Sequence, residues 1–244
     1  TRGEAALLVD CGISRKRVRE RMAKAGLSPE SLRAILITHE HSDHVSGVRV
    51  TAKRLGLPVY MARAAAMNHP LIDEVEVRLF EPGQPFRVAG FDVEPYSIPH
   101  DTVDPVGFVV GLTEDPAQRV GICTDLGSVT RLVIDRLRTC QVVLLEFNHD
   151  VEMLLEGPYP WNLKQRVRSR HGHLSNDQAG MLLKALGDAD LEAVFLAHLS
   201  EKNNHPDLAL SAARRAIETG HSRPVRVEVL AQNGPGAVLT VEGR

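Results

Sequence analysis

The chain has 244 residues, of which 43% are hydrophobic and 25% charged, the composition of a globular protein with a full hydrophobic core. Its net charge of −2 excludes a surface positive throughout, although it does not exclude a local basic patch. Cys11, Cys123 and Cys140 are far apart, so we expect reduced thiols rather than a disulfide framework. Because no apolar run is long enough to cross a bilayer and no signal peptide opens the chain, we expect a cytoplasmic protein with no membrane partner.

Apolar runs alternate with helical segments along the chain. Runs rich in Val, Ile and Leu predict buried strands at 5–12, 34–41, 57–62, 107–112, 119–125, 141–146 and 192–199. Segments 14–26 and 175–187 each begin with a capping residue and end with glycine, which predicts two helices. Turn residues within 86–100 predict a hairpin and therefore a mixed sheet. We expect one layered α/β domain covering residues 1–244.

The stretch ILITHEHSDHVSG (35–47) places His39, His41, Asp43 and His44 directly after a predicted strand. His39 and His41 are two residues apart, so at a strand end their side chains leave the same face and can bind one ion. Asp43 and His44 lie in the following loop and can face a second ion. The alternative is a polar turn in which Asp43 caps a helix, but four ligand-type residues in six positions favour a metal site.

Three later residues, His100, Asp125 and His198, each follow an apolar run and so lie at the rim of a sheet. Each alone is more often a hydrogen-bonded rim residue, but together with the turn they predict a centre of two divalent ions. Imidazole and carboxylate donors suit Zn, Mn or Fe; we expect Mn or Zn, with Asp125 as the bridge. Asp10 ends another strand, and we expect it to orient a ligand imidazole or to cap the next helix.

The pattern T-H-E-H-S-D-H at 38–44, followed by these three residues in order, resembles the H-x-H-x-D-H signature of the metallo-β-lactamase fold. The resemblance implies an α/β fold, an αβ/βα four-layer sandwich of two mixed β-sheets flanked by helices. It implies one ion on His39, His41 and His100, the other on Asp43, His44 and His198, and Asp125 between them.

Within that family, LLVDCGISRKRV, HDVEMLLEGPYPW and RHGHLSNDQAGMLL are most similar to the WalJ/YycJ group of bacterial nucleases. That group usually has a Ser/Gly/Asn-rich strand before LLVD. This sequence starts almost directly on LLVD, so we expect the N-terminal strand to be trimmed.

A further group of polar residues bears on the substrate. The basic run at 164–170 is either a solvated helix face or a contact for a nucleic-acid backbone. The segment GHLSNDQAG resembles the G-H-S-T segment of ribonuclease Z, which implies that His173 protonates the leaving oxygen while Glu146 holds its tautomer. The predicted catalytic residues are Asp43, Glu146 and His173, and the predicted substrate contacts are His149, Arg166, Arg168, Arg170, His171, Ser175 and Asn176. Tyr159 and Trp161 either stack on a terminal base or pack a proline-bounded loop.

The predicted function is a 5′-to-3′ DNA exonuclease of low sequence specificity, in which a metal-bound hydroxide attacks phosphorus and His173 assists the leaving group. The direction, and DNA rather than RNA as partner, follow from the resemblance; no oligomeric state is predicted. The alternatives are an RNA-directed nuclease, a small-molecule hydrolase of the glyoxalase II or lactonase type, and a non-hydrolytic di-iron or binding module. The basic run and His173 distinguish the nuclease from the small-molecule enzyme, and redox relatives often replace a ligand histidine that this chain keeps.

Overall fold

The structure is a computed structural model that describes residues 1, 3, 5–67, 69–187, 189–232, 234 and 236–240. The chain groups into two compact units, and the single domain expected from the sequence stays a prediction. The first unit comprises Thr1–Ser97, Thr102–Pro116 and Val238–Thr240, and the second comprises Ile98–Asp101, Ala117–Ala237 and Val241–Arg244.

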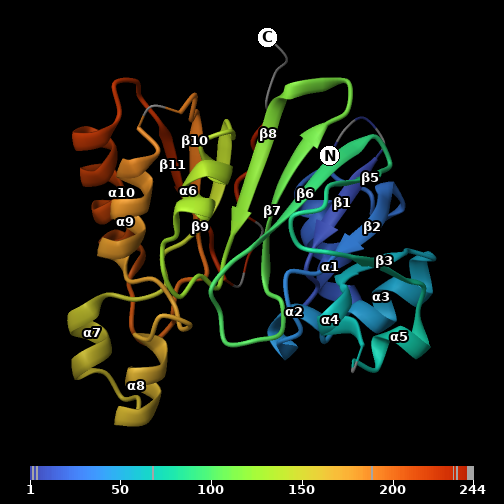
Figure 1. The fold of residues 1–244 in the computed structure, drawn as a ribbon, viewed down its shortest axis with the longest axis horizontal. Coiled ribbons are helices and arrows are strands. Elements are labelled where there is room, and N and C mark those ends of the chain that lie inside the picture. The colour runs from blue at the N-terminus through green and yellow to red at the C-terminus, as the bar shows by residue number, and fades with distance from the viewer. Residues whose placement is uncertain are drawn as a thin grey trace. The chain divides into compact units, whose positions relative to one another are not determined.

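The first unit contains a four-stranded sheet in the order β1-β2-β3-β4 (Figure 1). Its strands are β1 (Ala6–Val9), β2 (Leu32–Leu36), β3 (Val59–Ala62) and β4 (Val77–Phe80). All three pairings are parallel. We had expected a mixed sheet, and this one is purely parallel. Parallel neighbours need crossover connections, which contain the helical segments of this unit. These are α1 (Arg15–Lys24), the short 3₁₀ helix η1 (Pro29–Ser31), α2 (Ser42–Val45), α3 (Val48–Leu55), α4 (Arg63–Ala66) and α5 (Leu71–Glu74).

Three antiparallel strands complete the first unit: β5 (Phe86–Val88), β6 (Phe91–Ser97) and β7 (Val106–Leu112). Val88 pairs with Phe91, and the two residues between them, Ala89 and Gly90, have φ values of 51° and 84°. A two-residue turn with both φ values positive matches the right-handed twist of a hairpin. The predicted hairpin within 86–100 is therefore confirmed.

The second unit is built on the parallel strands β8 (Asp115–Cys123, most of it in this unit), β9 (Val142–Glu146), β10 (Ala193–Ala197) and β11 (Arg226–Val229). Its helices are α6 (Arg131–Leu137), α7 (Val151–Glu156), α8 (Trp161–Val167), α9 (Asn176–Ala185) and α10 (Pro206–Gly220). Helices α9 and α10 pack side by side (Figure 1). Ser175 caps α9 and forms a reciprocal capping box with Gln178, which explains why this predicted helix starts there.

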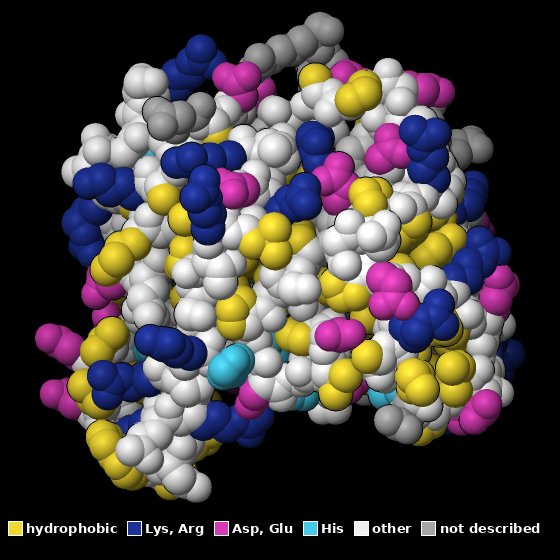
Figure 2. Space-filling model, viewed as in Figure 1, with side chains coloured by type: hydrophobic (Ala, Val, Ile, Leu, Met, Phe, Trp, Pro, Cys, Tyr) yellow, Lys and Arg dark blue, Asp and Glu magenta, His cyan; other side chains and the backbone are white. Residues whose placement is uncertain are grey.

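Every predicted strand overlaps an observed one, but β2 runs from Leu32 to Leu36 rather than from residue 34 to residue 41. His39 and His41 therefore lie in the loop between β2 and α2 and not on the strand. All three cysteines are free and buried, as expected. Cationic and anionic side chains are interspersed on the face shown in Figure 2, in keeping with the small net charge. Among the described residues, no helix combines the length and the apolar character that a membrane span requires.

Candidate metal centre and catalytic residues

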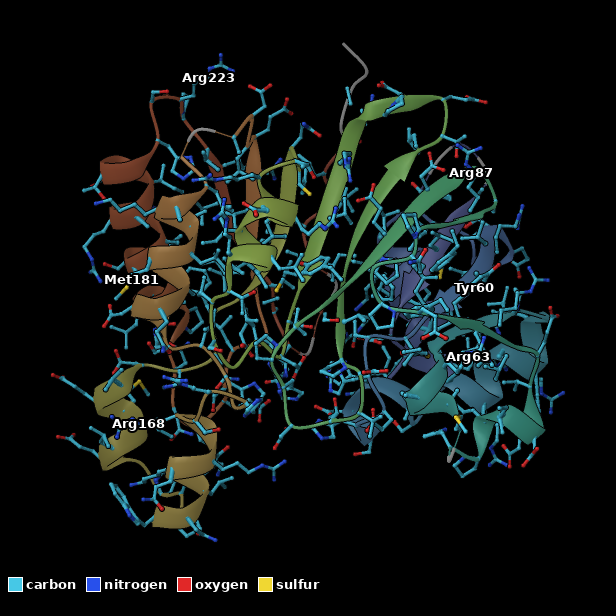
Figure 3. All side chains as sticks on the ribbon, viewed as in Figure 1. Tyr60, Arg63, Arg87, Arg168, Met181 and Arg223 are labelled. Atoms are coloured by element: carbon cyan, nitrogen blue, oxygen red, sulfur yellow. The ribbon has the colours of Figure 1, made fainter. Side chains whose placement is uncertain are left out.

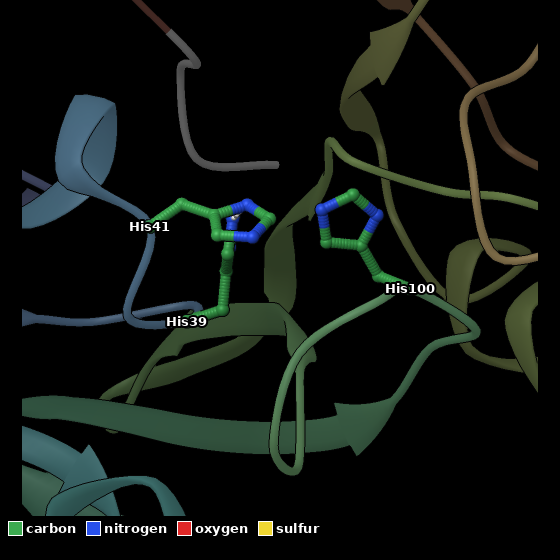
Figure 4. Close-up of side chains that lie close together, drawn as sticks. All are labelled: His39, His41 and His100. Atoms are coloured by element: carbon green, nitrogen blue, oxygen red, sulfur yellow. Dashed lines mark hydrogen bonds between the residues drawn. The ribbon is translucent and has the colours of Figure 1, made fainter. Parts of the chain in front are cut away.

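The turn after β2 gathers imidazole and carboxylate groups. His39 Nε2 lies 3.1 Å from His41 Nδ1 (Figure 4). Two nitrogens bound to one tetrahedral Zn²⁺ at 2.0–2.1 Å would be about 3.4 Å apart, so this spacing suits two ligands of one ion. His44 Nε2 lies 3.8 Å from Asp43 Oδ2, whose side chain is 69% exposed. The two predicted pairs thus form within the first unit, although through loop geometry rather than through the alternation of a strand.

The segment before α1 fixes the backbone of this turn. The Cys11 amide donates to His44 O (2.7 Å), and the Gly47 amide donates to Cys11 O (2.8 Å). A Cβ on Gly12 would lie 1.4 Å from Asp43 O, which is an impossible contact with backbone. Only glycine at position 12 therefore allows residues 11–12 to lie so close to the turn at 39–44, which we call the ligand turn. The alternative role of Asp43 as a helix cap is excluded, because His41 is the cap residue of α2 and Gly47 that of α3.

Asp10 orients the imidazoles of this turn. Its Oδ2 accepts from His44 Nδ1 (2.8 Å) and from Thr38 Oγ1 (2.7 Å), while its Oδ1 accepts from the Thr38 amide (2.9 Å). Since the Thr38 hydroxyl donates to Asp10, it can accept from His39 Nδ1 at 2.9 Å. Both imidazoles then carry their proton on Nδ1 and present Nε2 to an ion. The capping alternative for Asp10 is not observed, because Ser14 caps α1.

Thr38 is a site residue that our sequence reasoning missed. It is 2% exposed and links Asp10 to His39, and its only signal in the sequence was its position directly before the first histidine. Asp10 has φ 55°, a left-handed conformation that is costly for a residue with a side chain. Such strain is typical of functional sites.

Strand register assembles the polar cluster of the second unit. Cys123 of β8 pairs with Leu145 of β9, and Glu146 of β9 pairs with Ala197 of β10. Because carboxyl ends of parallel neighbours meet at one edge, Asp125, Glu146 and His198 come together. Asp125 and His198 both have left-handed backbones, with φ values of 58° and 57°. Donor atoms of these three residues and of His173 all lie within 4.8 Å of one another.

Glu146 is the hub of this cluster and is fully buried. Its Oε1 accepts from His173 Nδ1 (2.9 Å) and from His198 Nδ1 (2.8 Å). Its Oε2 accepts from the amides of Leu126 (2.9 Å) and Leu174 (3.0 Å). Burial raises the pKa of Glu146, but the hydrogen bonds and charge of the two histidines outweigh burial and lower it well below its usual range. Glu146 is therefore ionised, and each of its two oxygens accepts two hydrogen bonds from groups that the fold holds in place.

Our sequence reasoning assigned Glu146 to His173 alone and missed its second bond, to His198. That bond places the proton of His198 on Nδ1, and His198 Nε2 lies 3.4 Å from Asp125 Oδ1. For His173, burial lowers the pKa, but the hydrogen bond and the charge of Glu146 raise it above the ordinary value overall. One carboxylate thus orients a predicted ligand and the predicted acid together.

His100 belongs to the same unit. Its Nδ1 donates to Gly172 O (3.2 Å), and its Nε2 lies 3.8 Å from Asp125 Oδ1. Burial lowers the pKa of His100, which favours the neutral imidazole that binds metal ions. The adjacent Asp101 accepts a 2.6 Å hydrogen bond from Arg166 Nε.

The basic run differs from what we expected. Arg166 Nε donates to Asp101, whereas the buried Lys164 donates to Leu155 O (2.6 Å) and so serves the fold. Arg168 (Figure 3), Arg170 and His171 are exposed. Arg166 is exposed as well, but its guanidinium is hydrogen-bonded to Asp101.

Three other predicted substrate contacts are buried. Ser175 is 4% exposed and caps α9, and Asn176 exchanges two hydrogen bonds of 2.9 Å with the Asn204 side chain. Their roles as substrate contacts stay predictions, and the structure adds that both residues also start a helix. His149 is 1% exposed, and burial lowers its pKa to about 4, so it is neutral near pH 7. Trp161, by contrast, is 61% exposed on α8, so it does not fill the loop interior.

The residues present fit divalent metal ions. Each unit combines imidazole nitrogens with a carboxylate, a donor set that suits Zn²⁺, Mn²⁺ or Fe²⁺. In each unit a carboxylate outside the proposed ligands holds imidazole protons on Nδ1, as is usual around metal-binding histidines.

Comparisons with known proteins agree with this donor chemistry. Residues 6–199 match the family model described as the beta-lactamase superfamily domain. The chain is 38% identical over 210 residues to the exodeoxyribonuclease WalJ of Streptococcus pneumoniae, covering 83% of this chain and 77% of that protein. It is 32% identical over 219 residues to the exodeoxyribonuclease YycJ of Bacillus anthracis, covering 88% and 82%. The crystal structure of the metallo-beta-lactamase fold protein YhfI from Bacillus subtilis matches with a TM-score of 0.67 at 20% identity, covering 96% and 87%. The chain therefore belongs to the beta-lactamase superfamily, has the metallo-β-lactamase fold, and within that superfamily is a member of the WalJ/YycJ family.

Proposed function

We propose that the protein is a metal-dependent nuclease that hydrolyses phosphodiester bonds of DNA, as a 5′-to-3′ exonuclease of low sequence specificity. The single observation that carries the proposal is the hydrogen bond of 2.9 Å between His173 Nδ1 and the buried Glu146. An imidazole held by a carboxylate serves a poor leaving group such as a sugar alkoxide. The names of the relatives at 32–38% identity, exodeoxyribonucleases WalJ and YycJ, support the same substrate class.

The proposed ligands of two divalent ions, Mn²⁺ or Zn²⁺, are those that the family pattern implies: His39, His41 and His100; Asp43, His44 and His198; and Asp125 as the bridge. Bound there, such ions would supply activated water and neutralise charge on a phosphate. The chain's own carboxylates determine which ring nitrogen of these histidines carries the proton. Asp10 acts on His44 directly and on His39 through Thr38, while Glu146 acts on His198.

His173 is the proposed general acid. With its Nδ1 proton donated to Glu146, its Nε2 proton is directed away from the carboxylate and can pass to the departing sugar oxygen. The raised pKa of His173 keeps it protonated closer to neutral pH than a free histidine. Glu146 stays ionised and stabilises the imidazolium. Arg166, Arg168, Arg170 and His171 are proposed contacts for the sugar–phosphate backbone, and contacts of this kind carry no sequence information.

The test compares two substrates. His173→Ala should slow cleavage of an end-labelled natural oligonucleotide by about 10²–10⁴-fold, and should barely change cleavage of an activated aryl phosphodiester, whose leaving group needs no proton. His205→Asn is a matched control, because His205 is an exposed histidine that caps α10 and Asn also caps helices well. Equal loss on both substrates would contradict the acid role, and loss on neither would favour a small-molecule hydrolase. Labelling DNA and RNA at either end, with Mn²⁺ or Zn²⁺, tests sugar preference and direction.

A further inference from the structure

Helix α1 carries a high density of positive charge for a protein whose net charge is −2. Its sequence, RKRVRERMAK, contains six Arg or Lys residues and one acidic residue. Packing needs only the stripe formed by Val18, which is buried, and Met22, which packs against the same core. Fold stability therefore does not account for most of the cationic positions.

The arrangement of these charges opposes helix stability. The first turn has no acidic residue and contains Arg15, Lys16 and Arg17, although cations are unfavourable at the positive end of a helix dipole. Arg15 and Arg19 are like charges four residues apart, which also destabilises an isolated helix. A local arrangement that costs stability in this way is typical of a functional surface.

One side of α1 lines a shallow depression of about 500 Å³. Arg15, Lys16 and Arg19 border it, together with Glu20, Ala23 and Pro29. Lys16 is 4.0 Å from Glu20, with both side chains largely exposed at 86% and 56%, so this pair is weak. The acidic Glu30 lies near enough to Arg19 for its pKa to be lowered, chiefly by its hydrogen bond with Ser28 and in smaller part by Arg19. Three cations against these two carboxylates leave the depression positive.

The depression lies close in the chain to the segment that supports the ligand turn of the same unit. Cys11 is bonded through its backbone to His44 and Gly47, and the Ser46 hydroxyl donates to Gly12 O (2.8 Å). Helix α1 begins at Arg15, directly after that support. From Arg15 to Arg19 the helix rises about 6 Å, so the cations that border the depression follow one another along the helix axis.

We propose that Arg15, Lys16 and Arg19, the α1 track, bind backbone phosphates of a single DNA strand whose reacting phosphodiester lies at the ligand turn. This inference rests on the proposed nuclease function and adds a surface that is separate from the run at 164–170. The occupant is a polyanion with regularly spaced charges, because the track offers several cations along one helix side and few groups for reading bases. The track makes long substrates bind better than short ones.

The experiment compares two double variants with the same loss of charge on the same helix. Lys16→Gln/Arg19→Gln removes two track cations, whereas Arg17→Gln/Lys24→Gln removes two exposed cations that do not border the depression. Each metal-loaded enzyme is assayed on a single strand of about 30 nucleotides and on a trinucleotide, between 50 and 200 mM salt.

Because salt weakens phosphate contacts, KM should rise with salt, and losing two contacts should reduce the slope of log KM against log salt concentration by about 1.4. Between 50 and 200 mM salt, the rise in KM should then be about sevenfold smaller than in the wild type. Lys16→Gln/Arg19→Gln should show the smaller slope with the long strand only. The variant should change KM rather than kcat. Equal effects of both variants, or an effect on the trinucleotide, would overturn the track. If the wild type cleaves neither substrate, the nuclease proposal fails instead, and binding of the long strand in EDTA tests the track by itself.

Discussion

The two units position imidazoles in contrasting ways. In the first, one turn of six residues supplies His39, His41, Asp43 and His44. In the second, the cluster is drawn from strand ends and loops between residues 100 and 198, and it depends on the order β8-β9-β10. A compact sequence motif thus needs local backbone support, whereas a dispersed cluster needs correct sheet topology.

The two carboxylates that hold these imidazoles, Asp10 and Glu146, differ in the same way: Asp10 has local partners and Glu146 has partners from distant segments. Asp10 is 16% exposed and accepts three hydrogen bonds, two from Thr38 and one from His44. Glu146 is fully buried and accepts four, from three separate segments of the second unit. Replacing Glu146 should therefore disturb both the fold and the site, while replacing Asp10 should disturb the site alone.

The largest effect is expected for Glu146→Gln. The amide oxygen can satisfy only two of the four donors, and the amide nitrogen is a donor that faces the other two. Unsatisfied buried donors should lower the free energy of unfolding by about 2–5 kcal/mol, measured by urea denaturation of metal-free protein. Cleavage of natural DNA should fall at least as far as in His173→Ala, because His198 is misoriented as well.

This expectation depends on the second bond of Glu146, to His198, because a Glu146 that served only His173 would have the weaker effect when replaced. If Glu146→Gln unfolds like the wild type and loses less activity than His173→Ala, then the bond to His198 is unimportant. The contrast between a dispersed and a compact cluster would then disappear.

Sequence reasoning reached the ligand turn directly, because residues 39–44 are adjacent and their chemistry is visible in the letters. It also located Asp125 and His198, since each follows an apolar run that forms a strand. It could not find the double role of Glu146 or the part of Thr38, which depend on which strands are neighbours and how a hydroxyl proton is shared. It did not find that Ser175 and Asn176 are buried at the start of α9, because a capping segment and a substrate loop use the same polar residues.

A second prediction concerns acid and the second unit. Burial lowers the pKa of His149 to about 4, from an ordinary value near 6.5. Below pH 6.5 the unfolded chain binds a proton at this position that the folded chain refuses, so stability is complete above that pH and declines toward pH 4. The linked loss is about 3 kcal/mol.

The measurement for His149 is urea denaturation from pH 4 to pH 8 for the wild type and for His149→Gln, which cannot titrate. The difference between the two curves isolates His149, because carboxylates such as Glu146 titrate in both proteins. Parallel curves would show that His149 does not resist protonation and that the acid sensitivity of the fold arises elsewhere.

The smallest effect is expected for Asp10→Asn in the first unit. The amide nitrogen cannot accept from His44 Nδ1, so His44 is free to shift its proton to Nε2, the nitrogen that would bind an ion. Loss of such an orienting partner typically weakens metal affinity by about 10–100-fold, measured here by competition with a chelator. Stability of the metal-free protein should change little, because Asp10 is partly exposed. Asp104→Asn is the matched control: Asp104 also has a left-handed backbone, with φ 48°, in the same unit but outside the cluster. Equal loss of affinity in both variants would assign the effect to backbone strain or charge, whereas loss in Asp10→Asn alone would assign it to the hydrogen bonds that hold His44 and, through Thr38, His39.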